Sequence, residues 1–168
     1  MYTEYQPSHL LAPYIDNYWE LKGTPEYGMR IHILPDGCTD FIFTLGEVAE
    51  AVEKESLIMQ PYRSYFVGPM TKFSELVTYA ESVHMFGIRF LPCGLSCFTK
   101  LPLHEFVNSR INTKEMRAVF DDTFVERLCG QEHIEGRIQL VEGYLLAYLA
   151  RHYQSADSHV AMAVNMIN

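Results

Sequence analysis

Apolar and polar residues alternate over several short stretches in the first half of the chain, and a period of two predicts β-strands. The clearest pair of stretches, residues 31–34 and 40–45, is rich in β-branched and aromatic side chains and flanks Pro35, Asp36 and Gly37. Proline presets φ for a turn, aspartate can hydrogen-bond its own backbone, and glycine accepts a positive φ. The segment 31–45 therefore predicts a hairpin around which the rest of the chain packs.

Further strands are predicted where the alternation recurs between proline and glycine breaks, at 13–21, 56–60, 64–68, 76–79 and 83–90. Strands at this spacing, with apolar residues on both faces, favour a barrel or a sandwich. After residue 94 the period becomes helical. Short helical turns are predicted at 95–100 and 102–107, and longer helices at 123–128, 134–152 and 158–167.

Charge and composition narrow the function classes. The chain carries 21 acidic and 13 basic residues, a net charge of −8, so this part is not expected to bind a phosphate backbone. No apolar run approaches the roughly 20 residues that span a bilayer, and the N-terminus lacks the pattern of a signal peptide. A cytoplasmic location without membrane contact is expected, and the 4 cysteines are expected to be free thiols.

Several motifs occur together in a characteristic order: Tyr18-Trp19, LPDGCTDFIF at 34–43, FVGPMTK at 66–72 and GIRFLPCGLSCF at 87–98. Over nearly the whole chain this set resembles the sensor half of an AraC-type transcriptional regulator. The resemblance implies effector sensing, dimerisation through helices that follow the barrel, and DNA binding through a helix-turn-helix domain beyond residue 168.

The expected fold class is α+β, with an N-terminal cupin-like β-barrel (jelly roll) followed by a small C-terminal helical segment. The expected domains are a barrel sensor over 1–100, a helical dimerisation segment over 101–155, and the stub of a truncated DNA-binding domain over 156–168. The stub resembles the first helix of that domain. The alternative is a C-terminal amphipathic helix that docks on the core.

Polar residues on otherwise apolar strands supply the candidate ligand site. Asp40 and Arg89 either form a structural ion pair or face a polar ligand inside the barrel, because an unpaired buried charge is costly. Aromatic walls with a few convergent polar groups are typical of small-molecule sites. The predicted ligand-binding set for a still unidentified effector is Trp19, His32, Asp40, Phe41, Arg89 and Phe90, with Tyr18 and Phe43 as further wall candidates.

Metal and enzyme chemistry have little support in the pattern. A cupin metal site needs a histidine pair one residue apart, whereas His32 stands between two isoleucines, so no cofactor is expected. Cys93 and Cys97 are spaced for a zinc site with nearby histidines, although thiols are commonly small core residues. No nucleophile elbow or phosphate-binding glycine loop occurs. The rival hypothesis is a small cupin-type enzyme, an isomerase or a dioxygenase.

The helical stripe from residue 134 to 149 can serve as core or as a homodimer interface. Because the resembled family dimerises through helices after the barrel, a dimer contact is predicted at Ile138, Val141, Leu145 and Tyr148.

Overall fold

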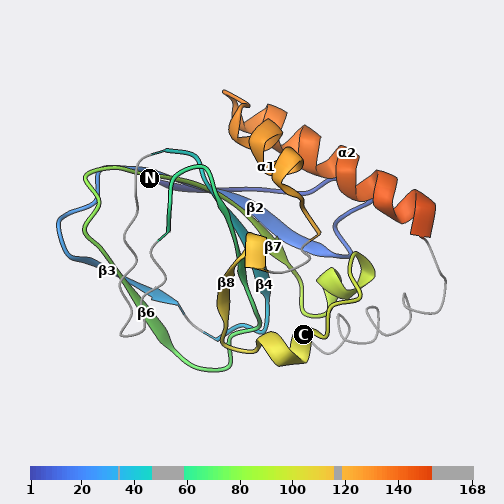
Figure 1. Cartoon of the computed structure of the whole chain (residues 1–168), viewed down its shortest axis with the longest axis horizontal. Helices are drawn as coiled ribbons and strands as arrows, with labels where there is room; N and C mark the ends of the chain where they lie inside the picture. Colours follow the sequence, from blue (N-terminus) through green and yellow to red (C-terminus); the bar gives the residue numbers. More distant parts are fainter. Residues whose placement is uncertain (34, 47–58, 116–118, 153–168) are drawn as a thin grey trace.

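The computed structural model describes residues 1–33, 35–46, 59–115 and 119–152, and gives the backbone alone for residues 31–33 and 74–77. The fold is α+β, with an antiparallel six-stranded sheet and two C-terminal helices (Figure 1). The strands are β1 (Tyr2–Tyr5), β2 (Ile15–Gly23), β3 (Met29–Ile33), β4 (Thr39–Thr44), β5 (Ser64–Val67), β6 (Ser74–Thr78), β7 (Val83–Phe90) and β8 (Arg110–Asn112).

The large sheet has the strand order β1-β2-β7-β4-β5-β8, while β3 and β6 pair as a separate two-stranded ribbon. In Figure 1 the helices lie on one side of the large sheet, and β3 and β6 lie on the other. Within the described residues β1 and β8 are the outer strands and do not pair with each other, so the sheet is not closed. A cupin-like jelly-roll barrel is therefore not confirmed.

The predicted hairpin over residues 31–45 is wrong in its pairing. β3 pairs with β6, with Met29 opposite Thr78 and Ile33 opposite Ser74, whereas β4 pairs with β5 and β7. The turn itself is present, because Asp36 accepts a hydrogen bond from the Cys38 amide at 2.9 Å. The local turn thus leads the chain from one sheet into the other, and the pairing of each strand is decided by distant partners.

Most other predicted strands are confirmed. The pattern finds β2, β5 and β7 and places β6 two residues late. The candidate at 56–60 lies largely outside the described residues. The sequence analysis did not predict β1 or β8. β1 covers Tyr2–Tyr5 and pairs with β2, and β8 has only three residues.

The helices follow the predicted spacing. α1 (Asp122–Cys129) begins at Asp121, whose carboxylate accepts a hydrogen bond from the Phe124 amide at 2.8 Å. α2 spans Ile134–His152, and 3₁₀ turns occupy η1 (Gly94–Cys97), η2 (Leu103–Phe106) and η3 (Thr113–Glu115). The predicted helix at 158–167 lies outside the described residues.

The core fills the space between the large sheet and the helices. Phe41, Phe43 and Phe86 are fully buried on the helix-facing side of β4 and β7, where Val141 and Leu145 of α2 are also fully buried. This side of the sheet is a packed aromatic core rather than a ligand lumen. In the part of the chain that the structure describes, no helix has both the length and the apolar character needed to cross a membrane.

Candidate functional site

Five polar or aromatic residues gather on the face of the large sheet that points away from the helices. Neighbouring strands place Asn17 of β2, Arg89 of β7 and Asp40 of β4 in one row, since Asn17 pairs with Arg89 and Arg89 with Asp40. Directly opposed residues present their side chains on the same face of a sheet. Together with Trp19 and Asp36 these residues form what we call the polar cluster.

An Arg–Asp pair forms the centre of the polar cluster. Arg89 donates from Nε to Asp40 Oδ1 at 3.2 Å and from Nη2 to Asp40 Oδ2 at 3.3 Å. The Trp19 indole donates from Nε1 to the same Oδ1 at 3.0 Å. Asp40 is 8% exposed, and these three donors compensate its carboxylate for the loss of water.

Trp19 can reach Asp40 because Gly87 stands opposite it. Trp19 and Gly87 are direct partners across β2 and β7, and the indole lies over the glycine. A Cβ atom built on Gly87 would lie 1.9 Å from Trp19 Cε2 and 2.3 Å from Nε1. The absence of a side chain at position 87 is therefore what positions the indole.

The turn before β4 adds a second carboxylate. Asp36 Oδ2 lies 3.3 Å from Arg89 Nη1, while Asp36 Oδ1 accepts the hydrogen bond from the Cys38 amide. Gly37 between them adopts φ 70°, a conformation that favours glycine. The Asp36 and Arg89 side chains are 36% and 28% exposed, so the cluster is open to solvent at this end.

Burial and the neighbouring charges shift the pKa values of two groups at this site. Burial raises the pKa of the Cys38 thiol to about 12, with Asp36, Asp16 and Asp40 raising it further and Arg89 opposing them. Burial raises the pKa of the Asp40 carboxyl, and the Arg89 cation opposes that shift. Two carboxylates of the polar cluster, Asp36 and Asp40, contact its single guanidinium, so the cluster has an excess of negative charge.

An aromatic ring borders the cluster at the first strand. The ring centroids of Tyr2 and Trp19 are 6.0 Å apart. The Tyr2 hydroxyl donates to Glu4 at 3.1 Å, and burial together with this contact raises its pKa to about 12. Since Glu4 is the direct partner of Trp19 in β1, a further carboxylate lies on this face.

The opposite face of the same strands carries a second polar group, which we call the anchor network: Glu20, His84 and Arg137. Arg137 of α2 donates from Nη1 to Glu20 Oε1 at 3.2 Å, and His84 Nε2 lies 2.8 Å from the same oxygen. Arg137 is 4% exposed, and burial lowers its pKa while Glu20 opposes the shift. The network fixes α2 to β2 and β7.

Glu142 strengthens the attachment of α2. Its Oε1 accepts hydrogen bonds from the Ser8 amide at 2.7 Å and from the Tyr18 hydroxyl at 3.4 Å. Burial, together with Glu142, raises the pKa of Tyr18. Sequence reasoning missed both attachments; the only signal was a charged residue at helical spacing inside the apolar stripe of α2.

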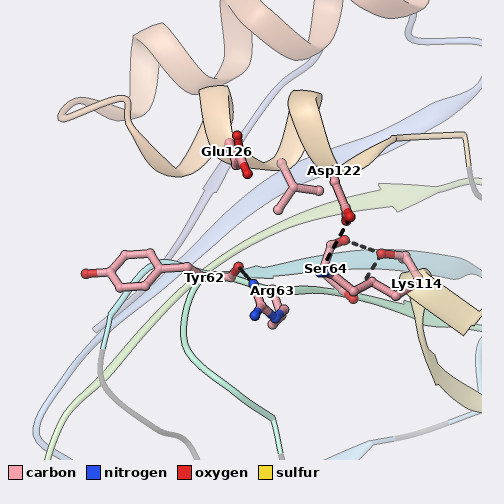
Figure 2. Close-up of a pocket in the computed structure, with 8 residues that line it drawn as sticks. Tyr62, Arg63, Ser64, Lys114, Asp122 and Glu126 are labelled. Carbon is pink, nitrogen blue, oxygen red and sulfur yellow. Dashed lines mark hydrogen bonds and ion pairs between the residues drawn. The ribbon is translucent and has the colours of Figure 1, made fainter.

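A small polar hollow lies at the other edge of the large sheet, between β5, η3 and α1 (Figure 2). It encloses about 270 Å³ including open solvent. Ser64 and Thr113 share a short hydrogen bond at its base, and Lys114 lies 3.5 Å from Asp122 at its rim. Its charged groups are mutually paired or solvent-exposed, so it offers no unsatisfied group to a ligand.

The predicted site residues divide between the two faces. Trp19, Asp40 and Arg89 meet in the polar cluster, where Asp40 and Arg89 form the ion pair that was one of the two alternatives. Phe41 and Phe90 are fully buried on the helix-facing side. The backbone of His32 lies in β3, but its side chain is outside the described residues. Sequence reasoning did not include Asn17 and Asp36 in the candidate site.

The predicted dimer residues on α2 also differ in exposure. Val141 and Leu145 are fully buried within the chain, where they hold α2 on the sheet. Ile138 and Tyr148 are half-buried and pack at the margin of the same core. The dimer stays a prediction.

Among the described residues, no three His, Cys, Asp or Glu side chains are arranged to hold a metal ion. None of the four cysteines, all of which are described, forms a disulfide; Cys93 is exposed and Cys97 is half-buried. The zinc alternative for this pair therefore gains no support from the described part of the chain.

Comparison with curated proteins gives no match. A family described as "Domain of unknown function (DUF6597)" matches residues 3–112, which is more than half of the chain. The matched region contains the described strands from β2 to β8, all of β1 except Tyr2, and every residue of the polar cluster. Its description makes no link to AraC-type regulators, so that resemblance stays a prediction. On this match, the chain belongs to the DUF6597 family.

Proposed function

We propose that this chain is the effector-sensing and dimerisation part of a cytoplasmic transcriptional regulator that binds DNA through a helix-turn-helix domain outside the given sequence. The ordered motifs at 18–19, 34–43, 66–72 and 87–98 support this assignment. The net charge of −8 agrees with a part that senses and assembles rather than one that contacts phosphates.

One structural observation supports the sensing role most directly: the polar cluster and the anchor network share their strands. In β2, Trp19 hydrogen-bonds within the cluster, and the next residue, Glu20, binds Arg137 of α2 on the opposite face. In β7, Arg89 hydrogen-bonds within the polar cluster, and His84 on the opposite face contacts Glu20 of the anchor network. A ligand that shifts β2 or β7 at the cluster would therefore shift the attachment of α2.

Such coupling requires that the ligand bind two arrangements of sheet and helix with different affinities. In this proposal the large sheet and the β3–β6 ribbon are the two walls of a cupin-like container. The burial of Trp19, Tyr65 and Val67 on the face away from the helices supports a second wall. The half-buried residues of α2, among them Ile138 and Tyr148, would then contact a second copy.

The product of the complete open reading frame provides the test. We expect the frame to encode a basic helix-turn-helix region after Asn168, and the full protein to bind DNA as a dimer with a salt-dependent affinity. Sedimentation velocity of the present chain should give a dimer, and Tyr148→Glu should make it monomeric while its far-ultraviolet circular dichroism stays that of a folded chain. A monomeric wild-type chain, or a full protein with no affinity for DNA, would refute the proposal.

A further inference from the structure

We propose that the polar cluster binds a protonated organic amine, held by carboxylates, by the Asn17 carbonyl oxygen and by the neighbouring aromatic rings. This inference rests on the proposed function, because it names the chemical class of the effector at the same site. The argument begins with an unsatisfied acceptor.

Asn17 carries the unsatisfied group. Its side chain is 6% exposed, and its Oδ1 atom is buried without a hydrogen-bond partner, while its Nδ2 donates to Asp16 Oδ2 at 2.9 Å. Because Asn17 pairs directly with Arg89, its amide lies on the same face as the Arg89 guanidinium. A buried acceptor without a donor is destabilising, and a bound donor would satisfy it.

The surrounding charge selects a cation. Asp36 and Asp40 both contact Arg89, and Asp16 accepts a hydrogen bond from Asn17, so the carboxylates at this site outnumber its one guanidinium. Asp40 takes two hydrogen bonds from Arg89, which leaves Asp16 and the exposed side of Asp36 with acceptor capacity. An anionic ligand would meet repulsion here, whereas an ammonium group supplies up to three donors.

The aromatic rings favour an organic cation over a bare ion. Tyr2 is 50% exposed and stands beside Trp19, so a hydrocarbon group attached to the ammonium can lie against its ring. No set of three metal-binding side chains occurs in the described part of the chain. A protonated amine needs only scattered oxygen acceptors and an apolar wall, and the cluster supplies both.

The test uses three probes of nearly equal shape: 2-phenylethylamine, 2-phenylethanol and phenylacetate. Calorimetric titration and thermal shift are measured on the whole chain at matched ionic strength. We expect saturable binding of the amine, with a raised melting temperature, and no binding of the alcohol or the acid.

Two variants examine the site, and one controls for net charge. Asp36→Asn removes a charge but retains the oxygen that accepts from the Cys38 amide, so the turn survives; amine affinity should fall about tenfold. Asn17→Ala removes the unsatisfied acceptor and should also weaken binding. Glu81→Gln removes one exposed charge beyond β6 and should leave the affinity unchanged.

The outcomes separate the inference from the proposed function. Saturable amine binding that falls with Asp36→Asn and not with Glu81→Gln supports the inference. Binding of the alcohol or the acid instead would overturn the amine class and leave the sensing role standing. Absence of binding by every probe, or equal loss in Glu81→Gln, would overturn the inference, while dimerisation and DNA binding of the full protein test the regulator separately.

Discussion

Replacing Gly87 by alanine should dislodge Trp19 from β7. The added Cβ would lie 1.9 Å from Trp19 Cε2, 2.2 Å from Cζ2 and 2.3 Å from Nε1, closer than any real contact. Trp19 is only 8% exposed and is hydrogen-bonded to Asp40 at 3.0 Å. The indole must therefore leave its position, and the Asp40 carboxylate loses a donor.

Two effects set the magnitude. Overpacking of a filled site costs about 1–3 kcal/mol. Loss of a hydrogen bond to a charged, buried acceptor costs about 1.5–3 kcal/mol. Together they predict that the free energy of unfolding falls by about 2.5–6 kcal/mol, a large share of the about 5–15 kcal/mol that is usual for a domain.

Urea unfolding followed by circular dichroism measures this loss, and the fluorescence of the single tryptophan reports the position of the indole. We expect a red-shifted emission in Gly87→Ala because the ring becomes solvated. Gly143→Ala is the matched control: nothing lies within 4 Å of a Cβ at Gly143 inside α2, so this change should stabilise by about 0.5–1 kcal/mol.

A double-mutant cycle gives the decisive comparison. In a Trp19→Leu background the indole is gone, so adding Gly87→Ala should cost about 1 kcal/mol or less. An equal cost in both backgrounds, or an unshifted emission in the single variant, would show that the Trp19 indole is not the reason why position 87 requires glycine.

Three further changes test the charges. Asp40→Asn should lower the free energy of unfolding by about 3 kcal/mol, because Arg89 loses a buried partner, and Asp40→Leu combined with Arg89→Met should recover part of it in urea unfolding. Arg137→Met should speed hydrogen exchange in α2, since Glu20 no longer holds the helix; unchanged exchange would contradict the anchoring role. Because burial raises the pKa of the Cys38 thiol from 9.0 to about 12, the unfolded chain ionises first and stability should fall as pH rises above 9.0; Cys38→Ala should show a smaller loss between pH 9.0 and about 11.

The parts that could be predicted from the sequence are those that local pattern decides. Period-two alternation identified β2 and β7, and the apolar stripe with an aspartate cap identified α1 and α2. The pairing of Asp40 with Arg89 was one of two alternatives that the cost of an unpaired buried charge on an apolar strand left open. In each case the signal lies in the residues of the element itself.

The parts that could not be predicted depend on partners distant in sequence. The turn at Asp36 suggested that β3 pairs with β4, yet β3 finds β6 some forty residues later, and no local signal distinguishes these outcomes. The residues around Gly87 do not indicate that the Trp19 indole lies over this glycine. Arg137 reads as one charge in an apolar helix, and only the fold brings Glu20 beneath it.

A buried ion pair by itself is weak evidence for stability, because a well-packed apolar pair is often as stable. The polar cluster is nearly closed to solvent at Asp40 and open at Asp36, whose side chains are 11% and 36% exposed. Asp36 belongs to the turn that joins the β3–β6 ribbon to the large sheet. A cation that takes Asp36 away from Arg89 would therefore act on the connection between the two sheets, and Arg89 lies on the strand that also carries His84 of the anchor network. In the proposed site, binding at the open end would reach the ribbon through the Asp36 turn and α2 through β7, His84 and the Glu20–Arg137 contact, without requiring a channel through the packed aromatic core.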